Sequence, residues 1–152
     1  MPHHEAYVFD MANKDQLKGD EKYEVQMEHF FAISKDTCNS DFVMDYTVIP
    51  VGSVSRAHCH INSALGQYFI KGEGYYLCGF NTEDEKKYYF HPGVFIYVPR
   101  GVTHKLVNTG DVPIESITVY SVGSGEATGK YYVEPPIESK STNFDFAEAN
   151  KK

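Results

Sequence analysis

Between Met27 and Val133 the chain consists of short apolar or alternating stretches separated by Gly, Pro, Asn and Asp, and this pattern constrains its fold most. Stretches of this length are too short for typical helices, and Tyr, Phe and Val, which are abundant here, favour strands. We therefore predict an all-β fold, a single-domain barrel or sandwich. The expected strands are residues 27–33, 42–49, 57–61, 67–71, 75–80, 87–90, 95–98, 103–107, 114–122 and 130–133.

Two connections in the middle of the chain have the composition of hairpin turns. One is the Gly72-Glu73-Gly74 sequence, whose glycines tolerate positive φ, and the other is the polar segment 81–85. They predict an antiparallel meander. We expect an N-terminal extension at residues 1–24, a barrel domain at 25–135 and a C-terminal tail at 136–152. Residues 11–24 are expected to form a loop or short surface helix, and residues 144–150 one or two helical turns.

Composition excludes several classes of function. A chain of 152 residues suits one domain, and its 21 acidic against 14 basic residues disfavour nucleic acid and anionic membrane surfaces. No apolar run approaches the roughly 20 residues of a membrane span, and the first ten residues lack a signal-peptide pattern, which predicts a cytoplasmic protein. The three cysteines are widely spaced without a C-x-x-C, so we expect reduced thiols rather than disulfides or a zinc knuckle.

His58 and His60 are two residues apart within an expected strand. This spacing places both imidazoles on one face of a strand and turns Cys59 to the other. Two imidazoles side by side are a typical part of a metal site. The alternative is a pair of surface histidines on an exposed strand.

The surrounding residues form two strings with fixed spacing. The first is Gly52-x5-His58-x-His60, and the second is Gly93-x5-Pro99-x-Gly101-x2-His104-x3-Asn108. In this order, the two strings resemble the paired motifs of the cupin superfamily. The resemblance implies a jelly-roll β-barrel with one divalent metal in its open mouth, bound by His58, His60 and His104.

One position departs from the cupin pattern. Members of the superfamily commonly carry a glutamate ligand where this chain has Leu65. Gln67, two residues further on, lies on the same face of the strand. Its amide oxygen is a candidate fourth ligand or a hydrogen-bonding partner for a metal-bound water, which makes Gln67 a candidate catalytic residue. The alternative is a hydrogen-bonded polar residue of the core.

A site with three imidazoles and no carboxylate accepts Fe(II), Zn, Mn, Ni, Co or Cu. Acid-free cupins of this kind include non-haem iron dioxygenases, so the resemblance favours Fe(II) and an oxidoreductase of the dioxygenase type acting on a small molecule. A redox-neutral isomerase, lyase or decarboxylase is the alternative, ranked second because the motifs contain no obvious carboxylate base. A third possibility is a barrel that binds a small ligand without catalysis.

Several residues that the two strings do not specify are interpreted separately. His29 is expected to be a partly buried strand residue with a satisfied ring, and His91 a turn residue. Arg56 and Arg100 are expected on the surface, although either one at the barrel mouth could clamp a substrate carboxylate. The apolar run at residues 6–9 has no evident hairpin partner, and its pairing across a twofold axis predicts a homodimer.

Overall fold

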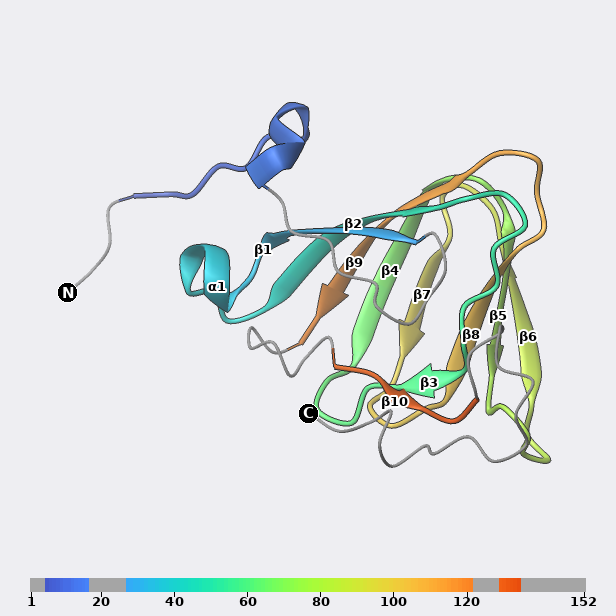
Figure 1. Cartoon of the computed structure of the whole chain (residues 1–152). Coiled ribbons are helices and arrows are strands. Elements are labelled where there is room, and N and C mark those ends of the chain that lie inside the picture. The colour runs from blue at the N-terminus through green and yellow to red at the C-terminus, as the bar shows by residue number, and fades with distance from the viewer. Residues whose placement is uncertain (1–4, 17–26, 122–128, 135–152) are drawn as a thin grey trace.

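The computed structural model describes residues 5–16, 27–121 and 129–134, and its strands form two five-stranded antiparallel sheets that enclose a barrel (Figure 1). The first sheet has the order β1-β2-β9-β4-β7 and the second β10-β3-β8-β5-β6. The strands are β1 (Glu28–Ile33), β2 (Val43–Ile49), β3 (His58–Cys59), β4 (Leu65–Lys71), β5 (Gly74–Cys78), β6 (Lys86–Phe90), β7 (Phe95–Val98), β8 (His104–Asn108), β9 (Ile114–Tyr120) and β10 (Tyr131–Tyr132).

All ten strands coincide with stretches predicted from the sequence, and no strand end differs from its prediction by more than two residues. The all-β, single-domain jelly-roll prediction is therefore confirmed. The helical content of the described residues is a 3₁₀ segment, η1 (Met11–Gln16), and a one-turn helix, α1 (Lys35–Cys38). The segment η1 falls where a loop or short helix was expected, and α1 begins at the N-cap Ser34, whose hydroxyl accepts from the backbone N–H of Thr37.

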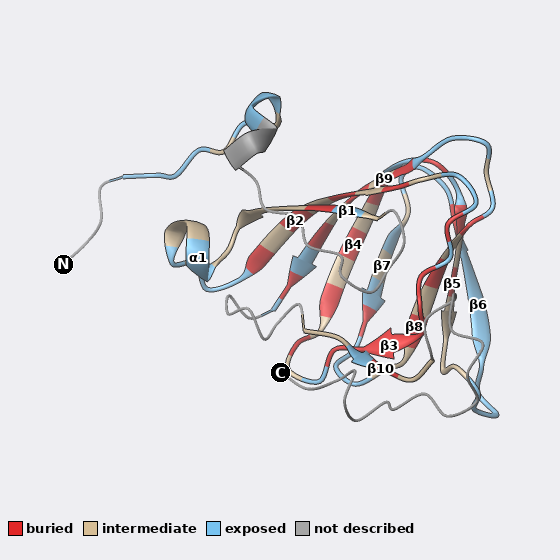
Figure 2. Ribbon diagram, in the orientation of Figure 1, coloured by how far each residue is buried: buried red, intermediate tan, exposed pale blue. Residues whose placement is uncertain are grey.

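The barrel interior is built largely from alternate residues of β2, β4, β8 and β9 (Figure 2). In β2, Val43, Asp45, Thr47 and Ile49 are buried while the residues between them are half-buried. Apolar side chains form two clusters, one around Phe69 and Ile114 and the other, smaller one around Leu65. Between these apolar clusters the inward rows carry polar residues, and this is where the candidate site lies.

The predicted meander is wrong at Gly72–Gly74. β4 pairs with β7 and β9 in the first sheet, whereas β5 pairs with β6 and β8 in the second, so this connection crosses between sheets. Gly72 has φ +89°, and a Cβ on Gly74 would lie 2.1 Å from the carbonyl oxygen of Val107. Gly74 thus permits the close approach of the paired strands β5 and β8, and Gly72 permits the bend of the connection. The sequence does not distinguish these uses of glycine from a tight hairpin.

The second predicted turn does form a hairpin. β5 and β6 pair antiparallel from Cys78 opposite Lys86 to Gly74 opposite Phe90, with residues 81–85 at the turn. The predicted helical turns at 144–150 lie outside the described residues. Among the described residues, no helix is long and apolar enough to cross a membrane.

Candidate metal centre

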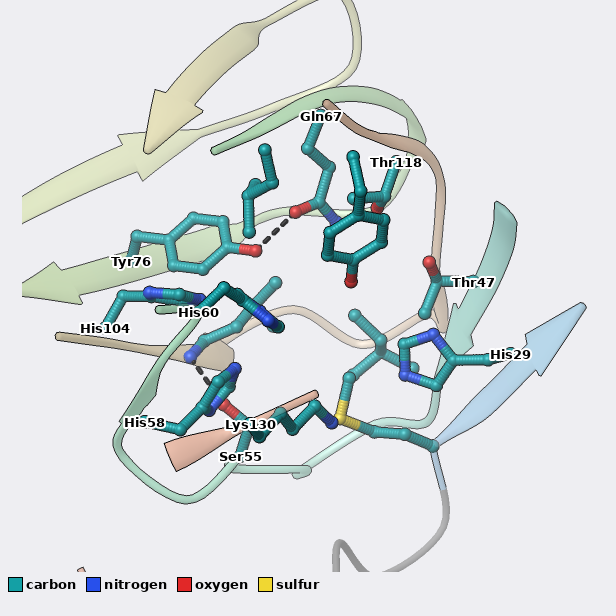
Figure 3. A pocket seen from close by; sticks show the side chains of 15 residues that line it. His29, Thr47, Ser55, His58, His60, Gln67, Tyr76, His104, Thr118 and Lys130 are labelled. Carbon is teal, nitrogen blue, oxygen red and sulfur yellow. Dashed lines mark hydrogen bonds between the residues drawn. The ribbon is translucent and has the colours of Figure 1, made fainter. Parts of the chain in front are cut away.

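The three motif histidines meet inside the barrel. His58 lies on β3 and His60 follows that strand, while His104 is the first residue of β8 and pairs directly with His58. One ring nitrogen from each histidine lies within 4.8 Å of the other two, and all three residues are buried. Figure 3 shows the rings gathered on one side of the cavity. The pairing of β3 with β8 thus brings together residues that lie up to 46 positions apart in the sequence.

Each of these histidines is held by a hydrogen bond from Nδ1 to a backbone carbonyl. The acceptors are Arg56 for His58 at 2.7 Å, Gly129 for His60 at 3.2 Å, and Val102 for His104 at 2.9 Å. Because Nδ1 must carry the proton to donate to a carbonyl, Nε2 is left as a lone-pair donor on each ring. This is the tautomer that a metal ligand requires, and backbone acceptors of this kind orient metal-binding histidines in general.

The three histidines are neutral at ordinary pH. Burial lowers the pKa of His60 to about 3 and that of His104 to about 4, and it lowers the pKa of His58 well below 6.5. The positive charge of Lys130 contributes in the same direction at all three rings. A metal therefore competes little with protons for these nitrogens at neutral pH.

The short segment 131–134 pairs with β3 through β10 and holds it in place. Glu134 accepts hydrogen bonds through its carbonyl from the Arg56 guanidinium and through its carboxylate from the Ala57 N–H, and it pairs with Lys105 at 3.0 Å. The Arg56 guanidinium also lies 3.8 Å from the ring centre of Tyr132. The surface position expected for Arg56 is wrong, because the residue is 1% exposed. Its guanidinium stacks on Tyr132 and donates to the Glu134 carbonyl, and these contacts hold the segment 131–134 against the strand that carries His58.

Gln67 lines the same cavity as the histidines, and so does Leu65. The Gln67 amide nitrogen donates to the Ser116 hydroxyl at 2.7 Å, and its amide oxygen accepts from the Tyr76 hydroxyl. The Gln67 amide is thus already oriented by two neighbours, whether it acts as a metal ligand or as a hydrogen-bonding partner of a metal-bound water. Tyr76 and Ser116, which sequence reasoning did not select, belong to this polar chain.

His29 is a further cavity residue that has no place in the motif-based site. It is 5% exposed, and its Nδ1 lies 2.9 Å from Oδ2 of Asp45, whose other oxygen accepts from the Thr47 hydroxyl at 3.0 Å. This contact engages one of the two ring nitrogens, as expected for a satisfied ring, but the residue is buried rather than partly buried. A signal was present in the sequence: Asp45 shares its strand face with Val43 and Ile49, where a carboxylate is unusual.

The cavity itself is small, and both polar and apolar side chains line it. Its volume is about 30 Å³, which holds about two water molecules. Lys130 and Thr118 also line it, together with apolar side chains such as Met27 and Leu106. The three converging Nε2 donors suit one divalent transition metal, and they leave coordination positions for water or substrate.

Comparison with known proteins supports the resemblance to cupins. The family model described as a cupin domain matches residues 45–120. A glucose-6-phosphate isomerase from Thermococcus onnurineus is 29% identical over 107 residues, which are 65% of this chain and 57% of the relative. The chain thus spans little more than half the length of this relative.

Two solved structures share the fold at low sequence identity. An oxalate decarboxylase from Bacillus subtilis, studied for its Mn(II) centers, has a TM-score of 0.66 at 16% identity over 79% of this chain and 31% of its own. The polyketide cyclase RemF from Streptomyces resistomycificus has a TM-score of 0.60 at 16% identity, covering 74% of this chain and 79% of its own. At these identities the likeness concerns the fold alone.

Proposed function

The chain belongs to the cupin family, and from this premise we propose that it is a metal-dependent enzyme acting on a small organic molecule with neighbouring oxygen atoms. The observation that carries the proposal is the set of three buried histidines whose Nδ1 atoms are all engaged by backbone carbonyls. A binding pocket without a metal has no need of three such oriented lone pairs.

His58, His60 and His104 would hold the metal, and Gln67 would act beside it. A divalent cation at this place supplies Lewis-acid chemistry, polarising a carbonyl oxygen or stabilising an enolate. Lys130 adds positive charge to the cavity wall. Together with the small volume, this charge favours a compact, anionic or enolisable substrate.

We place redox-neutral proton transfer first among the reactions, with an aldose–ketose isomerisation as its simplest form. The motifs contain no base, but the cavity contains His29, whose ring is bound to a carboxylate. The similarity to a glucose-6-phosphate isomerase supports the same class. Glucose 6-phosphate is therefore the first substrate to test. Because the cavity holds only about two water molecules, the reacting end of the sugar would enter it and the rest of the molecule would lie outside.

A dioxygenase reaction is the second candidate. The ligand set of three histidines without a carboxylate favours it, because neutral ligands leave more positive charge on the ion for an anionic substrate. Fe(II) would be the metal for this chemistry, since zinc has no accessible redox step. Manganese or zinc would serve the redox-neutral reaction equally well.

One experiment separates these candidates. Protein stripped of metal is loaded with Fe(II), Mn(II) or Zn(II), then assayed anaerobically for isomerisation of glucose 6-phosphate and aerobically for oxygen uptake with acetylacetone or catechol. We expect anaerobic turnover with Mn or Zn and its loss in His104→Ala, while His91→Ala, changed at an exposed histidine, retains it. Oxygen uptake with Fe(II) alone would favour the dioxygenase, and ligand binding without turnover in any form would favour a non-catalytic barrel.

A further inference from the structure

We propose that His29 is the proton-transferring residue of this site, with Asp45 and Thr47 as the residues that position it. The inference deepens the proposed function and rests on it. It assigns a catalytic role to strands β1 and β2, which contribute nothing to the two histidine motifs. The substrate class that it implies is a carbonyl compound that carries a hydroxyl group and a hydrogen on the adjacent carbon.

The geometry places His29 across the cavity from the candidate metal ligands. His29 and the three ligand histidines line one cavity, and Figure 3 shows the His29 ring pointing into it from the β1 side. The group therefore lies within the same small space as a substrate bound at the metal. His29 can therefore act on a metal-bound substrate without a change in the shape of the cavity.

The ring of His29 is held in one orientation. Its Nδ1 is bound by Asp45 at 2.9 Å, and the ring stacks on Phe31 with an interplanar angle of 5° and a centroid distance of 5.5 Å. Asp45 is itself held by the Thr47 hydroxyl at 3.0 Å. Because Nδ1 is occupied by the carboxylate, proton exchange with a substrate falls to Nε2.

Stability alone gives a poor account of this arrangement. Asp45 is 2% exposed and shares its strand face with Val43 and Ile49, in a row that would pack well if it were entirely apolar. Burying a carboxylate and an imidazole costs desolvation energy that their contact at best roughly offsets. A histidine oriented by a carboxylate is, in contrast, a typical general base.

The proposed step is balanced in atoms and electrons. Nε2 of neutral His29 takes the proton from the carbon next to the carbonyl, the C–H electron pair becomes the new C=C bond, and the carbonyl π pair moves to oxygen. Asp45 stabilises the imidazolium that forms. Nε2–H then returns the proton to the former carbonyl carbon as the hydroxyl proton passes between the two oxygens, so the isomer forms without an oxidant.

The first test is kinetic and uses metal-loaded protein with glucose 6-phosphate. We expect His29→Gln to lower kcat by at least about 100-fold, in the range of general-base catalysis, with KM and metal content unchanged. Incorporation of solvent deuterium into the sugar should fall in parallel. Asp45→Asn should also lower kcat, by up to about 10⁴-fold, as when the carboxylate that orients a general-base histidine becomes an amide, and His91→Gln is the matched control. Retention of kcat in His29→Gln would overturn the inference.

The second test needs neither metal nor substrate. In metal-free protein labelled with ¹⁵N-histidine, the His29 ring should be the neutral Nδ1–H tautomer at pH 8, and Asp45→Asn should shift it toward a tautomer mixture. An Nε2–H tautomer or an imidazolium in the wild-type protein would overturn the role of general base. If the wild type turns over no substrate, the proposed function fails, and this tautomer measurement alone then decides whether His29 has the required form.

Discussion

His58 and His104 stand directly opposite each other in the antiparallel ladder of β3 and β8, with ring centroids 4.4 Å apart. Their side chains therefore project from neighbouring strands toward one point, and His60, two residues along from His58, adds the third ring to it. The position of the three rings thus depends on the pairing of β3 with β8 as well as on the side chains themselves. Its consequences can be tested one residue at a time.

Removing a ligand histidine should abolish stoichiometric metal binding. We expect one divalent ion per wild-type chain and a loss of affinity in His104→Ala greater than the roughly 10–100-fold that follows loss of an outer-shell partner. Elemental analysis of untagged protein measures the stoichiometry, and isothermal titration the affinity. His91→Ala, at an exposed histidine with no place in the cavity, should bind as the wild type does. Full occupancy in His104→Ala would contradict the assignment.

The metal-free protein should lose stability in acid because its cavity histidines resist protonation. Burial holds the pKa of His60 at about 3 and that of His104 at about 4 in the folded state, against 6.5 for an ordinary histidine. Below pH 6.5 the unfolded chain therefore binds protons that the folded chain does not, and the free energy of unfolding falls as pH drops toward 4. Each such histidine adds a slope of up to about 1.4 kcal/mol per pH unit.

Urea unfolding at pH 7.5, 6 and 5 measures this dependence. Other groups titrate in the same range, so the comparison is with His60→Gln, which should have a shallower slope than the wild type. If the free energy of unfolding depends on pH equally in the two proteins, His60 has the same pKa in the folded and the unfolded state, and the prediction is wrong.

Gln67→Leu should separate the two candidate roles of the amide. Because Gln67 already bridges Tyr76 and Ser116, we expect the variant to keep its metal and to lose about 1–3 kcal/mol of stability from the two buried hydroxyls left without this partner. Elemental analysis and chemical unfolding provide the two measurements. Loss of metal in Gln67→Leu, with retention in Tyr76→Phe, would instead identify the amide as a direct ligand.

Gly74→Ala should destabilise the barrel strongly. A Cβ at this position would lie 2.1 Å from the Val107 carbonyl oxygen, so β5 and β8 must separate locally. We expect a loss of about 1–3 kcal/mol or more, the usual cost of overpacking. Gly66→Ala is the matched control, because a Cβ at Gly66 would meet nothing within 4 Å. Similar unfolding midpoints for the two variants would contradict the close approach of β5 and β8 at Gly74.

The homodimer predicted from residues 6–9 stays a prediction. In the structure Tyr7 is 62% and Val8 88% exposed, and within the described ranges this run belongs to neither sheet. We expect light scattering at micromolar concentration to give twice the chain mass, and deletion of residues 1–10 to give a monomer with an intact barrel. A monomeric mass for the full chain would refute the proposal.

Much of this protein is determined locally by its sequence. Alternation in stretches such as 43–49 gives each strand a buried and an outward face, and the i, i+2 spacing of His58 and His60 puts both on one of them. The pairing of these histidines with His104 was accessible only through the likeness of two spaced motifs to a known family. That likeness covers the ligands and the strands next to them.

Only the tertiary structure decided the rest of the site. Gly72–Gly74 has the composition of a hairpin, yet its strands enter different sheets, because partner choice depends on which strands bury each other's apolar rows. His29 and Asp45 are 16 residues apart on β1 and β2, and no spacing rule links them to His58. His29 lines the same cavity as the three motif histidines, and Asp45 contacts its ring. This arrangement arises because two sheets close around one interior and bring together inward faces that are distant along the chain.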